Sequence, residues 1–129
     1  FTVANNQSQL TLKWNFLSEE FLEYINSVYQ DYFKIILRKQ DGTEVVLYSG
    51  TIDQIAAQFN ATRTDPGQLI NVNPGIVFDQ GGVYMTGWQT SVFDITPYRG
   101  ENVVIVFICG DVGDSIYDTA ILLDDVKIN

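Results

Sequence analysis

The chain has 129 residues, a hydrophobic fraction of 46% and a formal net charge of −9. This length suits one domain with a sizeable core, and the apolar content excludes a disordered chain. No apolar run is long enough to cross a bilayer, and an acidic chain without a basic patch is excluded as a binder of nucleic acid or anionic lipid.

The first predicted element is a strand over residues 9–16. Apolar and polar side chains alternate strictly there, which is the period of a strand with one buried face. We expect Trp14 to belong to the core. The apolar face consists of Leu10, Leu12, Trp14 and Phe16.

A second strand is predicted over residues 31–39 and a third over residues 44–48. The pair Asp41-Gly42 between them indicates a hairpin turn, because both residue types suit the backbone angles of tight turns. Residues 51–59 then carry apolar side chains at helical spacing, and Thr51 with Gln54 forms a possible capping box. This segment predicts one short helix.

The remaining chain is divided into short strands by turn residues. We expect strands over residues 68–72, 83–88 and 92–95, then a proline-containing bend at 96–100. Residues 103–109 are apolar on both faces, which predicts a central strand with Cys109 as a small buried hydrophobic residue. In the last predicted strand, over residues 120–128, we expect the inward face to carry Asp124, which would need a partner there, together with Ala120, Leu122, Val126 and Ile128.

Short strands with one helical interruption predict an all-β fold, specifically a jelly-roll-like antiparallel β-sandwich. The first and last strands of such folds commonly pair antiparallel, which would bring the end of the first strand beside the start of the last. The chain begins at Phe1 without a Met or a signal-type segment. We therefore expect residues 1–129 to be one domain excised from a larger protein.

The chain contains no histidine, and Cys109 is its only cysteine. Intrachain disulfides, ordinary zinc ligation and nucleophiles activated by histidine are therefore excluded.

Two acidic stretches contain no basic residue and together account for the negative excess. Crowded carboxylates repel one another unless a positive charge lies among them, and oxygen donors suit Ca²⁺ best. We predict a shared Ca²⁺ site where the two stretches meet at one rim of the sandwich. The alternative is an acidic surface loop of ordinary turn residues with no ligand. The first stretch, residues 18–31, contains Glu19, Glu20, Glu23 and Asp31, and the second, residues 110–125, contains five aspartates, Asp111, Asp114, Asp118, Asp124 and Asp125.

Three blocks carry a resemblance to a known family: FLSEEFLEYINSVYQDYF at residues 16–33, INVNPG at 70–75 and GDVGDSIYDTAILLD at 110–124. They resemble the choice-of-anchor L type domain of bacterial surface proteins and the related β-sandwich ligand-binding domains near the ends of large repeat-built adhesins. The blocks are spread over most of the chain and occur in the family's order. Members are extracellular modules, and the resemblance implies Ca²⁺ binding here as well.

The resemblance also implies a set of metal ligands. Two departures from the family concern this set: Gln30 stands where the family often has asparagine, and cysteines that some members carry in the first block are missing. Rigidity would therefore depend on packing and metal. The candidate ligands are Glu20, Asp31, Asp111, Asp114 and Asp118, with Glu19 as a further candidate.

Four aromatic residues are candidates for contact with a ligand, because exposed aromatic rings near a carboxylate-rich rim stack on sugar rings in many binding modules. The alternative is that these rings pack in the core or at its rim. Tyr117 lies within the second acidic stretch itself. The candidates are Tyr84, Trp88, Tyr98 and Tyr117.

Three functions are compatible with these observations. The first is an extracellular, Ca²⁺-dependent adhesion module that recognises a glycan or peptide on another cell surface or matrix. The second is a structural spacer stiffened by Ca²⁺. The third is a β-sandwich glycoside hydrolase that uses two clustered carboxylates. A nearby cation would oppose the protonated carboxyl that such a hydrolase needs, so we expect no enzymatic activity.

Overall fold

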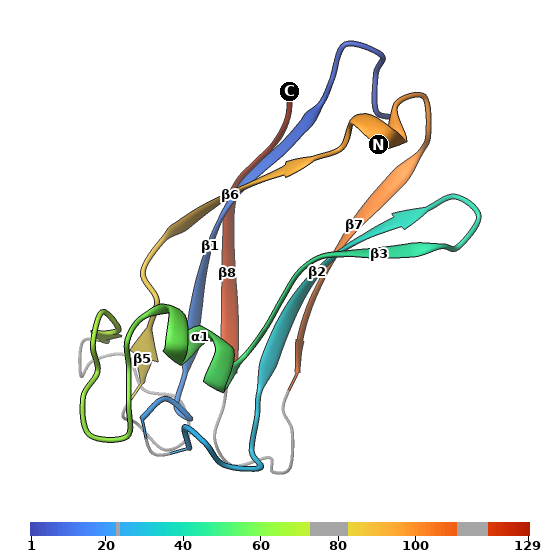
Figure 1. The fold of residues 1–129 in the computed structure, drawn as a ribbon. Helices are drawn as coiled ribbons and strands as arrows, with labels where there is room; N and C mark the ends of the chain where they lie inside the picture. Colours follow the sequence, from blue (N-terminus) through green and yellow to red (C-terminus); the bar gives the residue numbers. More distant parts are fainter. Residues whose placement is uncertain (23, 73–82, 111–118) are drawn as a thin grey trace.

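A computed structural model describes residues 1–22, 24–72, 83–110 and 119–129 and consists of two antiparallel sheets and one short α-helix (Figure 1). The predicted all-β sandwich is confirmed. None of the described helices is long and apolar enough to span a membrane. The elements are β1 (Gln9–Ser18), β2 (Tyr32–Lys39), β3 (Glu44–Thr51), α1 (Ile52–Gln58), β4 (Ile70–Asn71), β5 (Tyr84–Met85), β6 (Gln89–Asp94), the 3₁₀ turn Thr96–Tyr98, β7 (Val103–Gly110) and β8 (Thr119–Ile128).

The first sheet is built around β1. On one side β1 pairs with β8, and on the other it pairs with β6 and then with β5, which in turn pairs with β4. The β1–β8 ladder is antiparallel and runs from Leu10 opposite Ile128 to Ser18 opposite Thr119. The predicted pairing of the first and last strands is therefore confirmed. The second sheet has the order β3-β2-β7.

The core lies between the two sheets and is centred on aromatic rings. The predicted apolar face of β1 is buried, including Trp14 at 3% exposure. The Trp14 ring lies 4.9 Å from that of Phe33 on β2 and 5.4 Å from that of Tyr48 on β3. These contacts join β1 of one sheet to two strands of the other.

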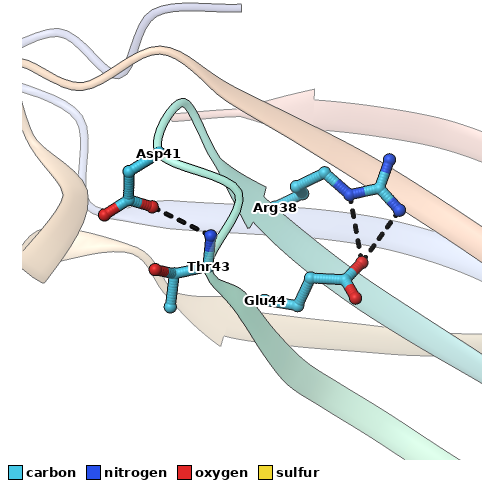
Figure 2. A network of polar contacts seen from close by, with 4 residues as sticks. All are labelled: Arg38, Asp41, Thr43 and Glu44. Atoms are coloured by element: carbon cyan, nitrogen blue, oxygen red, sulfur yellow. Dashed lines mark hydrogen bonds and ion pairs between the residues drawn. The ribbon is translucent and has the colours of Figure 1, made fainter.

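The hairpin between β2 and β3 forms at the predicted Asp41-Gly42 pair (Figure 2). Gly42 has a φ of 89°, and Asp41 Oδ1 accepts a hydrogen bond from the backbone N–H of Thr43 at 2.9 Å. That hydrogen bond stabilises the carboxylate and lowers the pKa of Asp41 below its usual value. Beside the turn, Nε and Nη2 of Arg38 donate to Oε2 of Glu44 at 3.0 and 2.9 Å.

The helix α1 also begins where the capping box predicts. The Oγ1 of Thr51 accepts from the backbone N–H of Gln54 at 3.3 Å, and the Gln54 side chain accepts from the backbone N–H of Thr51 at 3.0 Å. Both bonds satisfy backbone donors that the first turn of a helix leaves without a partner.

Two predictions about β7 are wrong. This strand pairs with β2 and lies at the edge of the second sheet as described, not at its centre. Its outward side chains are exposed, Val104 at 56% and Ile108 at 36%, and Cys109 is exposed as well. Because β7 lies at an edge, its last residues Ile108 and Cys109 are exposed even though the strand is apolar on both faces.

The predicted inward face of the last strand is wrong for residues 120–124. Between Thr11 and Lys13 the β1–β8 register shifts, and Asp125 adopts a φ of 53°. This β-bulge places an extra residue in β8 and so reverses which side chains face inward on its two sides. Ile128 packs against the core as predicted, but Ile121 packs there in place of its predicted neighbours, and Asp124 is exposed.

Candidate metal centre

Three carboxylates of the first acidic stretch are buried at one end of the sandwich. Glu19, Glu20 and Asp31 are exposed by only 3%, 0% and 0%. They lie in the connection that leaves β1 after Ser18 and enters β2 at Tyr32, at the bottom of the view in Figure 1. Burying a carboxylate costs several kcal/mol unless hydrogen bonds, opposite charge or a metal offsets the loss of water.

The local sequence explains why this connection turns inward. Its apolar residues Phe21 and Ile25 are exposed by 1% and 5% and belong to the main core, and the Phe21 ring lies 5.7 Å from that of Phe16. Leu22 and Asn26 adopt positive φ values of 73° and 65°. The packing of Phe21 and Ile25 thus carries the adjacent glutamates beneath the surface.

Hydrogen bonds join the carboxylates to two strands that are far apart in the sequence. The backbone N–H of Asp31 donates to Oε1 of Glu20 at 3.0 Å, and the backbone N–H of Glu20 donates to Oγ of Ser18 at 3.0 Å. The hydroxyl of Thr119 donates to Oδ2 of Asp31 at 2.5 Å. Since this hydroxyl has one proton, the 2.7 Å contact between Ser18 and Thr119 has Ser18 as the donor.

Helix α1 braces the same connection. The backbone N–H of Ile52 donates to the carbonyl of Asp31 at 3.0 Å, and the backbone N–H of Asp53 donates to Oε1 of Gln30 at 2.9 Å. Asp53 in turn accepts from the backbone N–H of Asn26 at 2.6 Å. The Gln30 amide therefore holds the helix against the connection.

The residues on either side of positions 111–118, within the second acidic stretch, lie at the same end. Gly110, the last residue of β7, pairs with Tyr32, and Thr119, the first residue of β8, pairs with Ser18. Tyr32 is the neighbour of Asp31 in the chain, and Ser18 is the neighbour of Glu19. The predicted residues Asp111, Asp114, Tyr117 and Asp118, like Glu23 of the first stretch, lie outside the described residues.

Within the described ranges, no group of three or more His, Cys, Asp or Glu side chains is arranged to hold a metal ion. The carboxylates that the structure does bring together are Glu20 and Asp31, with Glu19 adjacent in the chain. Asp124 and Asp125 lie elsewhere on β8, where the Asp125 backbone N–H donates to Oδ1 of Asp124 at 2.8 Å.

The aromatic candidates do not form one patch. Tyr84 lies on β5 opposite Ser18, at the carboxylate end, and packs partly against the core. Trp88 follows β5 and is 52% exposed. Tyr98 lies in the 3₁₀ turn at the opposite end of the sandwich. Ile95, just before this turn, donates its backbone N–H to the carbonyl of Ser8, which directly precedes β1.

Sequence reasoning did not identify Ser18, Thr119 or Asp53 as part of this region. The two hydroxyls, of Ser18 and Thr119, come together only through the pairing of the first and last strands, so neither residue is distinctive in the sequence. Asp53 carried a local signal, since an acidic residue in the first turn of a capped helix commonly stabilises the helix itself.

Replacement of Thr119 by valine is expected to lower the free energy of unfolding by about 1–3 kcal/mol, because the isosteric side chain leaves buried Oδ2 of Asp31 without the hydroxyl donor. Chemical denaturation measures this loss. Thr119→Ser keeps the donor and should retain most of the stability. Equal losses in the two variants would contradict a role for the hydroxyl.

We found no match to this chain among protein-family models, curated proteins or solved structures.

Proposed function

We propose that this domain is an extracellular, Ca²⁺-dependent binding or adhesion module of a bacterial surface protein, without catalytic activity. The observation that carries the proposal is the position of two buried carboxylates, Glu20 and Asp31, beside the ends of β7 and β8 at one end of the sandwich. Buried Asp31 donates its backbone N–H to buried Glu20 and accepts from Thr119. Gly110 and Thr119, the residues on either side of positions 111–118, pair with Tyr32 and Ser18 at the same end.

The donor chemistry fits calcium. Carboxylate oxygens are hard donors, and Ca²⁺ takes six to eight of them with flexible geometry. Neither acidic stretch contains a lysine or arginine that could supply the positive charge instead. In this proposal Glu20 and Asp31, with Glu19, provide ligands from the first stretch, and Asp111, Asp114 and Asp118 provide them from the second.

A bound Ca²⁺ would fix two connections of the sandwich relative to each other and can accept oxygen atoms of a ligand. The ligand classes that this chemistry suits are sugar hydroxyls and the carboxylate or carbonyl groups of a peptide. Of the candidate aromatic residues, Tyr84 lies opposite Ser18 at that end, Trp88 follows β5, and Tyr117 belongs to the second stretch. Such a module would act at the cell surface as part of a longer polypeptide.

A glycan and peptide array, probed with and without Ca²⁺, tests the binding function. We expect signals that require Ca²⁺, are not restored by Mg²⁺ and disappear in Asp31→Asn. Asp41→Asn, at the distant β2–β3 turn, serves as the matched control and should bind normally. Stabilisation by Ca²⁺ without any array signal would favour the structural spacer instead.

A further inference from the structure

Strands β5 and β6 pair one after the other with the same side of β1, and a β-bulge separates them. Met85 lies opposite Leu17, and Gln89 lies opposite Trp14. Between these two pairs β1 has two residues, whereas the segment that joins β5 to β6 has three. Gly87, the middle residue of that segment, adopts a φ of 72°. An extra residue of this kind often redirects a neighbouring side chain.

The bulge turns the ring of Trp88 away from the core. Met85 packs with Leu17 in a small cluster that is separate from the main core, on the outer face of the first sheet. Alternation from Met85 without the extra residue would point Trp88 inward. With the extra residue Gln89 lies on the inner face opposite Trp14, and Trp88 is 52% exposed. Folding alone does not favour an exposed indole at this position, and such departures from local rules are typical of functional sites.

The outward side chains of β6 continue from Trp88 in one row, called here the β6 strip. Ser91 accepts a hydrogen bond from the indole of Trp14 at 2.9 Å and Phe93 packs against the core, so the odd-numbered side chains of β6 face inward. The even-numbered side chains are exposed. The strip is about 20 Å long, given the usual rise of a strand. It consists of Trp88, Thr90, Val92 and Asp94.

The end of the β6 strip away from Trp88 borders a hollow. Its volume of about 440 Å³ is within the range of sites that hold small organic ligands. The lining combines two hydroxyls, an amide, a carboxylate and one apolar side chain, so the hollow is polar with a single apolar wall. The lining residues are Ser8, Gln9, Val92, Asp94 and Thr96.

Asp94 supplies this hollow with a charged acceptor. The backbone N–H of Thr96 donates to its Oδ1 at 2.9 Å. Hydrogen bonds from the side chain and the backbone of Thr96 lower the pKa of Asp94 below its usual value. The carboxylate is exposed and ionised, and an ionised acceptor forms the stronger class of hydrogen bond with a hydroxyl donor.

The chemistry of the strip matches an uncharged oligosaccharide. A sugar ring has an apolar face that stacks on an indole and hydroxyls that bond to carboxylates, amides and other hydroxyls. Val92, 55% exposed, lies between Thr90 and Asp94 in the row and opposite Thr11 on β1. Polar groups thus interrupt the apolar surface along this row, whereas a docked protein or lipid needs a continuous one. The charge of Asp94 disfavours an acidic sugar.

We propose that the β6 strip is a second ligand site of the domain and binds an uncharged oligosaccharide without Ca²⁺. One sugar ring stacks on Trp88, and another ring of the same chain lies in the hollow, where its hydroxyls donate to Asp94. The strip contains none of the proposed metal ligands. Binding at the strip therefore goes beyond the Ca²⁺-dependent function and is independent of its success or failure.

The test uses the whole domain in excess chelator and an array of uncharged glucose, mannose, galactose and xylose oligomers, from disaccharides to hexasaccharides. We expect binding to at least one series, with an affinity that rises with chain length because longer chains reach both ends of the strip. The bound oligosaccharide should also protect exposed Trp88 from fluorescence quenching by acrylamide. Trp14, the other tryptophan, is 3% exposed and contributes little to this quenching.

Three substitutions make the test specific. Trp88→Ala should weaken binding by about tenfold or more, whereas Trp88→Phe keeps a ring and should retain a substantial part of the affinity. Asp94→Asn keeps an oxygen toward Thr96 but loses the charge, and should weaken binding by about fivefold. Val46→Ala, at a side chain that is 54% exposed on the other sheet, is the control and should bind normally. The melting temperature of each variant verifies its fold.

Three results would overturn the proposal: no binding to any series in chelator, unchanged binding in Trp88→Ala, or a preference for acidic oligosaccharides. Binding that appears only with Ca²⁺ would support the function proposed for the metal end and would count against the β6 strip. Binding in chelator that depends on Trp88 and Asp94 would support the strip whatever the outcome of the Ca²⁺ experiments.

Discussion

Replacement of Phe33 by alanine is expected to lower the free energy of unfolding by about 3–5 kcal/mol, which is the usual cost of removing a large aromatic side chain from a packed core. Phe33 is fully buried, and its ring centre lies 4.9, 5.2 and 5.0 Å from the rings of Trp14, Phe16 and Tyr48. These rings belong to both sheets. The loss should therefore affect the packing of one sheet on the other, and not a single strand.

Urea denaturation followed by tryptophan fluorescence measures this effect, since Trp14 contacts Phe33 directly. Phe33→Leu fills much of the same volume and should cost clearly less than Phe33→Ala. Val92→Ala, at a side chain that is 55% exposed on β6, is the surface control and should change stability by no more than about 0.5 kcal/mol. A loss below about 1 kcal/mol in Phe33→Ala would show that the aromatic cluster does not hold the sheets together.

Calcium is expected to raise the melting temperature of the domain by about 10 °C or more when its free concentration is roughly 1,000 times the dissociation constant, because binding to the folded state alone then adds about 4 kcal/mol. The ion would offset the repulsion and the lost hydration of Glu20 and Asp31, which are fully buried. Mg²⁺ should have a much smaller effect, since it prefers a rigid octahedral shell and retains its waters.

Asp31→Asn is the informative variant for this experiment. The amide can keep an oxygen toward the Thr119 hydroxyl while removing the charge, so the fold is expected to persist but the Ca²⁺-dependent rise should be lost. Asp41→Asn removes a carboxylate at the distant β2–β3 turn and should retain the full rise. Identical melting of the unmodified domain in Ca²⁺ and in excess chelator would eliminate the metal site.

Those parts of the fold that depend on local chemistry could be predicted from the sequence. The alternation in residues 9–16 identified β1 and its buried face, because the side chains of a strand alternate regardless of what packs on them. The Asp41-Gly42 turn and the Thr51–Gln54 capping box were identified for the same reason, since each is satisfied within a few residues. The pairing of β1 with β8 followed from the fold class.

The structural predictions that were wrong concern features that depend on distant parts of the chain. Whether the apolar run of β7 lies at the centre or the edge of a sheet is decided by which strands pair beside it, and the exposure of Cys109 follows from that. The bulge at Asp125 is a shift in the register of β8 against β1, and it reversed the predicted inward face over residues 120–124. Predicted strands at 68–72 and 83–88 shortened to two residues each, Ile70–Asn71 and Tyr84–Met85.

The position of the candidate site could be predicted only through the pairing of the first and last strands, which brings Ser18, next to Glu19, opposite Thr119. The burial of Glu20 and Asp31 at that end is an observation of the structure, and their role as metal ligands stays a prediction. The hydroxyls of Ser18 and Thr119 could not be predicted, because serine and threonine at strand ends are ordinary residues until the strands pair. The proposal that Asp111, Asp114 and Asp118 provide ligands stays a prediction.

A calorimetric Ca²⁺ titration of four proteins tests most directly whether the two acidic stretches bind the same ion: the unmodified domain, Asp31→Asn, Asp114→Asn and the double variant. If both carboxylates bind one ion, each single variant should lose affinity, and the double variant should lose much less than the product of the single losses, a coupling of about 0.5–3 kcal/mol. Unchanged affinity in Asp114→Asn, or losses that simply multiply, would contradict a shared site.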